Sequence, residues 1–152
     1  MNLTELLTPE RIKVPLEASD KDGVLEELVR LAAGGGLVQD VARLVRAVRD
    51  REEVLSTGIG NGVAVPHGKC PGVSSLLLAA GVAREPIDFD ALDGEPVRLF
   101  FLLVGPESAP GPHVRALSRV SRLLRRDSLR DRLAQASSPD EFHAVIAEAE
   151  AS

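Results

Sequence analysis

Two consecutive segments in the first third of the chain carry apolar residues at intervals of three or four, which predicts two amphipathic helices. The first segment begins after a capping residue, Ser19 or Asp20, and ends at Gly34-Gly35-Gly36. The second segment continues into Arg51-Glu52-Glu53. The apolar positions that define the two helices are Val24, Leu28, Leu31 and Ala32, followed by Val41, Leu44, Val45 and Val48.

Shorter apolar runs predict strands. Residues 75–82 and 99–104 are largely apolar, which is typical of strands covered on both faces. Further short strands are expected at residues 11–16 and 63–65, and residues 86–94 are rich in turn formers.

The last third of the chain becomes helical after a proline-rich loop. The first of these helices has an apolar face, and the basic residues of its other face are interpreted as solvent-facing. A shorter helix is expected at about residues 128–135, and Ser138-Pro139-Asp140-Glu141 is a capping box that starts the last one. The apolar face comprises Val114, Leu117, Val120 and Leu124, and the basic stripe comprises Arg115, Arg119, Arg122 and Arg126.

The order of these elements is one strand, two helices, three strands and three helices. It predicts an α/β fold in which helices flank both faces of a mixed sheet. A chain of 152 residues fits one compact domain, so residues 1–152 are expected to form a single three-layer α/β/α domain.

Composition excludes several classes of function. The net charge of −5 and the absence of Trp and Tyr argue against nucleic acid as a partner. The longest apolar runs are far shorter than a bilayer span, and the N-terminus has no signal-peptide pattern. The single cysteine, Cys70, excludes an internal disulfide framework. A cytoplasmic protein without membrane insertion is expected.

The stretch with the clearest chemical content is residues 57–68, Thr-Gly-Ile-Gly-Asn-Gly-Val-Ala-Val-Pro-His-Gly. Its glycines permit positive φ angles, and successive N–H groups in such a loop can form an anion-binding concavity. His67 follows, and a neutral imidazole is a nucleophile near neutral pH, so the pattern suggests phosphate chemistry on histidine. A tight turn leading into a strand is the alternative. The candidate phosphoryl-binding residues of the loop are Thr57, Gly58, Gly60, Asn61 and Gly62.

Two further residues could assist His67. His113 follows the proline-rich loop at the start of a helix, past the end of a predicted strand. Both histidines follow short strands, so they are expected to meet at one edge of the sheet. Arg51 could supply a guanidinium suited to phosphate, although spacing alone favours a solvated charge at the end of a helix. His143 is interpreted as a surface or boundary residue.

Two competing chemistries have weaker support. His67, Cys70 and His113 are possible metal ligands, but a closed zinc site usually has four ligands with paired spacing, and a second pair is missing. A serine nucleophile is disfavoured because no Gly-x-Ser-x-Gly motif is present.

Arg51-Glu52 followed by residues 56–69 resembles the active-site signature of IIA domains of the fructose/mannitol class. These domains belong to the bacterial phosphoenolpyruvate-dependent phosphotransferase system. The similarity extends over nearly the whole chain. Within the class, residues 87–89 and 92–94 look most like the stand-alone nitrogen-regulatory IIA proteins.

This resemblance implies a role for each candidate residue. His67 matches the phosphorylated histidine, which takes its phosphoryl group from a histidine phosphocarrier protein, HPr or its nitrogen-branch counterpart. His113 matches a second active-site histidine, and Arg51 matches an arginine near the phosphoryl group. The family uses no metal or organic cofactor.

Three outputs are compatible with these residues. A regulatory, nitrogen-type protein would change its affinity for target proteins when phosphorylated. A transport component would pass the phosphoryl group to a IIB partner for fructose- or mannitol-type sugar uptake. The absence of a IIB or membrane segment in the chain favours the regulatory output. An anion-binding domain without transfer is a minor third hypothesis.

Overall fold

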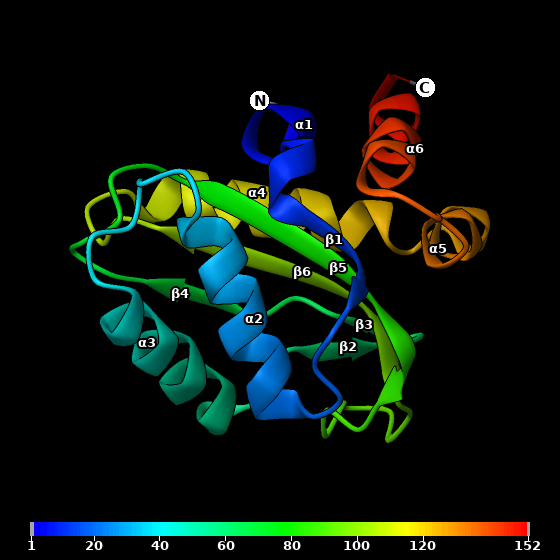
Figure 1. Ribbon diagram of the computed structural model, residues 1–152, viewed down its shortest axis with the longest axis horizontal. Coiled ribbons are helices and arrows are strands. Elements are labelled where there is room, and N and C mark those ends of the chain that lie inside the picture. The colour runs from blue at the N-terminus through cyan, green and yellow to red at the C-terminus, as the bar shows by residue number, and fades with distance from the viewer. Residues whose placement is uncertain (1, 152) are drawn as a thin grey trace.

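The computed structural model describes residues 2–151. Its helices, drawn in Figure 1, are α1 (Leu3–Leu6), α2 (Lys21–Ala33), α3 (Val41–Val54), α4 (Pro110–Leu123), α5 (Asp127–Ala134) and α6 (Pro139–Ala151), with a 3-10 turn η1 (Pro9–Arg11). Its strands are β1 (Ile12–Leu16), β2 (Gly58–Gly60), β3 (Val63–Ala64), β4 (His67–Lys69), β5 (Leu77–Ile87) and β6 (Val97–Gly105). Every helix and strand that the hydrophobic pattern predicts is present. The structure adds α1, η1, β2 and β4.

The strands of the described residues form one mixed sheet around β5 and β6. These two long strands are antiparallel, with Ala80 opposite Phe101. β1 joins the free edge of β5 in parallel, and β2 extends the other side of the sheet by pairing with β3 in the antiparallel sense. Both β3 and β4 run parallel to β6 on the same edge, β3 beside Leu99 and β4 beside Leu103. This shared edge is where the candidate site forms.

Helices cover both faces of the sheet, so the molecule has three layers, as predicted (Figure 1). One core lies between the sheet and α2 and α3, and it includes Leu28, Leu44 and Phe100. The other lies beneath α1, α4, α5 and α6, and it includes Phe101 and Phe142. Phe100 and Phe101 enter opposite cores because successive side chains of a strand point to opposite faces. No helix among residues 2–151 has the length and apolar character to cross a bilayer.

The buried face of α4 differs from the prediction. The pattern placed Val114 on the apolar face, but the structure leaves Val114 61% exposed and buries His113 instead. The prediction was wrong at this position because it counted only apolar residues, whereas an imidazole occupies the core side of the first turn. The residues of α4 that are buried are His113, Ala116, Val120 and Leu123.

One strand boundary and one added helix also differ from the prediction. β5 continues to Ile87, so the turn-rich segment starts later than expected. α1 is a single turn whose first N–H groups are bonded by a distant side chain. The Glu150 carboxylate accepts from Leu3 N at 2.6 Å, from Thr4 N at 3.1 Å and from Arg119 Nε at 3.3 Å. A helix this short depends on such tertiary contacts, which local periodicity does not reveal.

Candidate active site

His67 is the first residue of β4, at the edge of the sheet. Its neighbour Pro66 accepts a hydrogen bond from Leu103 N at 3.0 Å, which fixes the strand against β6. On the other side of the chain, α3 approaches β4 closely at Gly68. A Cβ there would lie 2.9 Å from Val48 Cγ2, so only glycine allows this packing without a shift. Strand pairing and helix packing therefore hold His67 from two sides.

One ring nitrogen of His67 is tied to the backbone. Nδ1 lies 3.0 Å from the Val65 carbonyl oxygen. A carbonyl oxygen can only accept, so Nδ1 carries the proton and donates this bond. In the neutral ring, Nε2 then keeps its lone pair. His67 thus presents Nε2 as a nucleophile of fixed tautomer.

His113 lies beside His67. The two ring centroids are 5.8 Å apart, with the ring planes at 65°. His113 is only 3% exposed, and neither of its ring nitrogens has a hydrogen-bond partner among residues 2–151. The structure therefore brings together two histidines that are 46 positions apart in the sequence. Within the described part of the chain, the ring nitrogens of His113 are therefore free to form hydrogen bonds next to the ring of His67.

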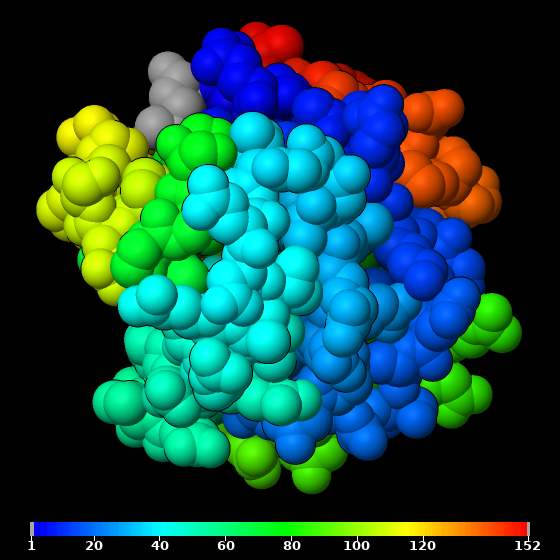
Figure 2. Space-filling model, turned by 60° about the vertical axis from the view of Figure 1, so that its left-hand side comes forward, coloured from blue at the N-terminus to red at the C-terminus, as the bar shows by residue number. Residues whose placement is uncertain are grey.

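The segments around the histidines are joined by backbone contacts. Cys70 N donates to the Gly105 carbonyl at 3.1 Å, which places the end of β4 beside the end of β6. Figure 2 shows the segment that follows β4, in green, next to the segment that precedes α4, in yellow. A Cβ on Gly105 would lie 3.6 Å from His113 Nδ1. The end of β6 thus lies against the buried ring.

Both histidines are held in their neutral form at neutral pH. Burial lowers the pKa of His67, the positive charges of Arg51 and Lys69 lower it further, and the Val65 carbonyl and the Glu52 carboxylate act in the opposite direction. Burial also lowers the pKa of His113, to about 4, with smaller contributions from His67 and Lys69. A neutral imidazole is the form that can act as a nucleophile.

Arg51 lies in the last turn of α3. Its Nη1 donates to the Leu55 carbonyl at 2.8 Å, so the side chain folds back along the end of its own helix. Its charge lowers the pKa of His67, which places the guanidinium within electrostatic range of that ring. Arg51 therefore belongs to the neighbourhood of the site without a direct bond to His67.

The tip of the glycine-rich stretch does not reach the histidines. Asn61 and Gly62 have φ angles of 58° and 76° and form a two-residue turn between β2 and β3. Positive φ at both positions is the signature of a type I′ hairpin, for which Asn-Gly is the preferred pair. Asn61 N donates to Asp93 Oδ2 at 3.1 Å. The N–H group of Asn61 is thus bonded to the loop between β5 and β6.

The register along β6 separates this turn from His67. Val63 faces Leu99, whereas His67 faces Leu103. Four positions of a strand correspond to roughly 13 Å, and the turn lies beyond Val63. The predicted role of Gly60, Asn61 and Gly62 in binding a phosphoryl group at His67 therefore lacks geometric support. Gly58 fills a packing role, because a Cβ there would lie 2.7 Å from Ala91 Cβ.

Thr57, at the start of the same stretch, does connect to the site. Its carbonyl accepts from Val65 N at 3.0 Å, and Val65 is the residue that holds His67 Nδ1. Thr57 N and Oγ1 both donate to the Glu52 carboxylate, at 2.9 and 2.6 Å. Sequence reasoning assigned no role to Glu52. Its position four residues after Val48, on the apolar face of α3, is the signal that marks it.

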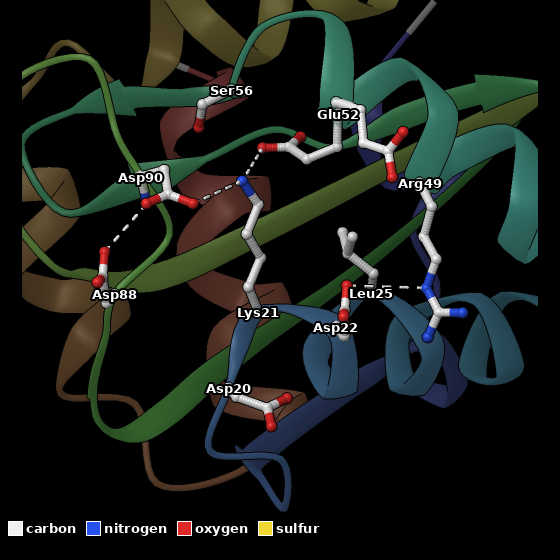
Figure 3. A pocket seen from close by; sticks show the side chains of 10 residues that line it. Asp20, Lys21, Asp22, Leu25, Arg49, Glu52, Ser56, Asp88 and Asp90 are labelled. Carbon is white, nitrogen blue, oxygen red and sulfur yellow. Dashed lines mark hydrogen bonds and ion pairs between the residues drawn. The ribbon is translucent and has the colours of Figure 1, made fainter.

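Glu52 also borders a cleft of about 750 Å³ between α2, α3 and the loop at residues 88–90. Lys21 reaches across it, with Nζ 3.1 Å from Glu52 Oε1 and 3.6 Å from Asp90 Oδ2 (Figure 3). The same Nζ lies 4.7 Å from the centroid of the Phe89 ring. Neither histidine of the site lines this cleft.

The remaining candidates lie elsewhere. Cys70 is 1% exposed and packs in the core between the sheet and α2 and α3. His143 lies on α6, on the opposite face of the sheet from that core. Among residues 2–151 there is no group of three or more His, Cys, Asp or Glu side chains arranged to hold a metal ion.

A model of the family described as "Phosphoenolpyruvate-dependent sugar phosphotransferase system, EIIA 2" matches residues 5–149. The chain belongs to this family. It is a IIA phosphoryl-transfer component of the phosphotransferase system, of the fructose/mannitol class.

Relatives in this family carry two kinds of name. The fructose-specific EIIABC component of Bacillus subtilis is 38% identical over 146 residues, which cover 96% of this chain and 23% of that longer protein. A nitrogen regulatory protein of Bradyrhizobium diazoefficiens is 35% identical over 147 residues, which cover 97% of this chain and 95% of that protein. The structure of nitrogen regulatory protein IIA-Ntr from Neisseria meningitidis superposes with a TM-score of 0.87 at 36% identity, covering 93% of this chain and 97% of that one. Family membership is therefore firm, and identity alone does not separate the two outputs.

Proposed function

We propose that Nε2 of His67 accepts the phosphoryl group in this IIA protein. The observation that carries the proposal is the bond between His67 Nδ1 and the Val65 carbonyl, because it leaves Nε2 as the ring nitrogen with a free lone pair. The donor is a phosphohistidine on a histidine phosphocarrier protein, HPr or its nitrogen-branch counterpart.

The transfer is a displacement at phosphorus. The lone pair of Nε2 attacks the phosphorus atom, a new N–P bond forms, and the N–P bond of the donor breaks. The electron pair of the broken bond returns to the donor's ring nitrogen. The proton on Nδ1 of His67 stays in place, where the Val65 carbonyl stabilises the positive charge that develops on the ring. No metal or organic cofactor takes part in the proposed step.

His113 and Arg51 stabilise the transferred group in this proposal. A neutral imidazole carries one N–H donor, and the nitrogens of His113 have no competing partner among residues 2–151. The ring centroid lies 5.8 Å from that of His67, so in this proposal an N–H group of His113 donates to an oxygen of the phosphoryl group on Nε2. Arg51 contributes positive charge at the same site, where the transferred oxygens are negative.

For the biological output we propose regulation of the nitrogen type. Support comes from relatives named nitrogen regulatory proteins that match this chain over nearly their whole length, and from the TM-score of 0.87 with one of them. Phosphorylation adds about −1.5 to −2 charges at one place, which can change the affinity for a target protein. Delivery to a IIB partner for fructose-type uptake is the second candidate, supported by the 38% identity to a fructose-specific component.

The phosphorylation step can be tested with purified proteins. The protein is incubated with phosphoenolpyruvate, enzyme I and a histidine phosphocarrier, and an acid-labile mass gain of one phosphoryl group is followed. We expect the gain in the wild type and in a His143→Ala control, and its loss in His67→Ala. A gain that survives His67→Ala would overturn the assignment.

The output requires a cellular test. In a strain that lacks the gene, the rate of fructose and mannitol uptake is measured with and without the restored protein. Unchanged uptake together with a phosphorylation-dependent change in bound target proteins supports regulation. Uptake that depends on His67 contradicts it and favours transport.

A further inference from the structure

We infer that Glu52 is a positioning residue for the phosphoryl acceptor, acting on His67 through Thr57 and Val65. This inference rests on the proposed function of His67. Its evidence is a continuous set of hydrogen bonds from a buried carboxylate to the ring, together with the unusual burial of the residues that form it.

The first step is the environment of Glu52. Within residues 2–151, the polar or charged residues with 5% exposure or less are Glu52, Thr57 and His113, and all three lie at this site. Removing a carboxylate from water is costly unless its oxygens are paired. Here Oε1 accepts from Thr57 N and pairs with Lys21, and Oε2 accepts from Thr57 Oγ1. Every oxygen of Glu52 is thus committed to a fixed partner.

The second step is what Glu52 fixes. Thr57 has a backbone donor and a hydroxyl donor, and one carboxylate holds both. This two-point attachment determines the orientation of the Thr57 peptide, whose carbonyl accepts from Val65 N. Val65 in turn presents its own carbonyl to His67 Nδ1. Glu52 therefore fixes Thr57, Thr57 fixes Val65, and the Val65 carbonyl oxygen determines the tautomer of His67.

The third step is charge. Glu52 raises the pKa of His67 against the dominant lowering by burial, which indicates that its negative charge acts on that ring. A more basic ring is a better nucleophile for phosphorus. Lys21 balances the carboxylate from the cleft side, where Figure 3 shows its ammonium between Glu52 and Asp90. The carboxylate that acts on His67 is thus the one that Lys21 pairs with.

A matched pair of variants tests this inference. Glu52→Met keeps the side-chain volume and removes both acceptors. Glu150→Met makes the same change at a carboxylate whose side chain is 4% exposed, against 3% for Glu52. Glu150 accepts from two backbone N–H groups and pairs with a cation, whereas Glu52 accepts from one backbone N–H group and one hydroxyl and pairs with a cation. Glu150 lies on the opposite face of the sheet. Both variants lose stability. Only Glu52→Met is expected to alter the site.

Two measurements separate positioning from stability. Long-range ¹H–¹⁵N spectra report the tautomer and the pKa of His67, and the rate of phosphoryl acceptance is measured per folded molecule. We expect Glu52→Met to shift His67 from the Nδ1–H form to a mixture of tautomers, to lower its pKa and to slow acceptance about 10- to 100-fold. Glu52→Gln keeps an acceptor for Thr57 N and is expected to restore the tautomer but not the pKa. A wild-type tautomer and rate in Glu52→Met, or an equal loss in Glu150→Met, would overturn the inference.

A milder variant covers the case in which Glu52→Met does not fold. Thr57→Val removes only the hydroxyl donor, and Thr57→Ser keeps it. The inference requires a slower rate and a changed tautomer population in the valine variant, with the serine variant close to wild type. Equal behaviour of the two variants counts against it. If the wild type accepts no phosphoryl group, the proposed function fails, and the tautomer measurements still decide the role of Glu52.

Discussion

Acidification is expected to destabilise the fold through His113. Burial lowers the pKa of this ring to about 4, whereas in the unfolded chain it takes a proton near the ordinary value of 6.5. Between these two values the unfolded state binds more protons than the folded state. The contribution of His113 to the free energy of unfolding is therefore fully present above pH 6.5. It falls as the pH is lowered from 6.5 to about 4, and it changes little below that value.

The size of the effect follows from the two pKa values. One pKa unit corresponds to 1.36 kcal/mol, so the difference between 6.5 and about 4 amounts to about 3 kcal/mol. A domain of this size is typically stable by about 5–15 kcal/mol, so the loss is a large fraction of the total. His67, whose pKa is also lowered by burial, contributes in the same direction.

The assay compares urea unfolding of the wild type and of His113→Leu at pH 7.5 and at pH 4.5. Leucine has a similar volume and does not titrate. The wild type is expected to lose about 2–3 kcal/mol more than the variant over this range. Carboxylates with lowered pKa, such as Glu27 and Glu141, titrate below this window and cancel in the comparison. Equal losses in both proteins, or a measured His113 pKa near 6.5, would refute the reasoning.

Three further predictions concern Arg51, Asn61 and Gly68. Arg51→Gln should raise the pKa of His67, because it removes a positive charge near the ring. It should nevertheless slow phosphoryl acceptance about tenfold, because the oxygens of the transferred group lose that charge; an unchanged rate would remove Arg51 from the site. Asn61→Ala should cost about 1–2 kcal/mol in urea unfolding because of its φ of 58°, yet leave acceptance per folded molecule at the wild-type level; slower acceptance would restore the turn as a phosphoryl-binding element. Gly68→Ala should cost about 1–3 kcal/mol by forcing Val48 away from β4, with a matching fall in melting temperature; full stability would contradict the close packing.

The layers of the fold are predictable from sequence because they depend on strong periodicity. Apolar residues recur at helical spacing around Leu28 in α2 and around Leu44 in α3, over about two turns in each helix. Both leucines are fully buried. The unbroken apolar run at residues 99–104 indicates a strand that is covered on both faces. β6 is such a strand, because its side chains enter both cores. α1 lies outside such reasoning because its N–H groups are bonded by Glu150, which is 147 residues from Leu3.

The sequence predicted a glycine-rich loop before His67, but it did not predict where the tip of this loop lies relative to His67. Asn61-Gly62 between two short β segments is the pair that a type I′ hairpin prefers, so the turn itself was open to prediction. What the sequence does not contain is the register of β3 and β4 along β6, which separates the turn from His67. Register depends on which side chains enter the two cores, and that is decided by the whole sheet.

Polar residues of the site interrupt the apolar faces of two helices. Glu52 continues the apolar face of α3, and His113 takes the core position on α4 that the pattern assigned to Val114. Each is a local conflict, because a polar group occupies a place where an apolar one would stabilise the fold more. Conflicts of this kind persist where function requires them. Polar residues buried on the core-facing side of a helix are therefore the feature of the structure that points to the site, and both of these residues act on His67 in the folded chain.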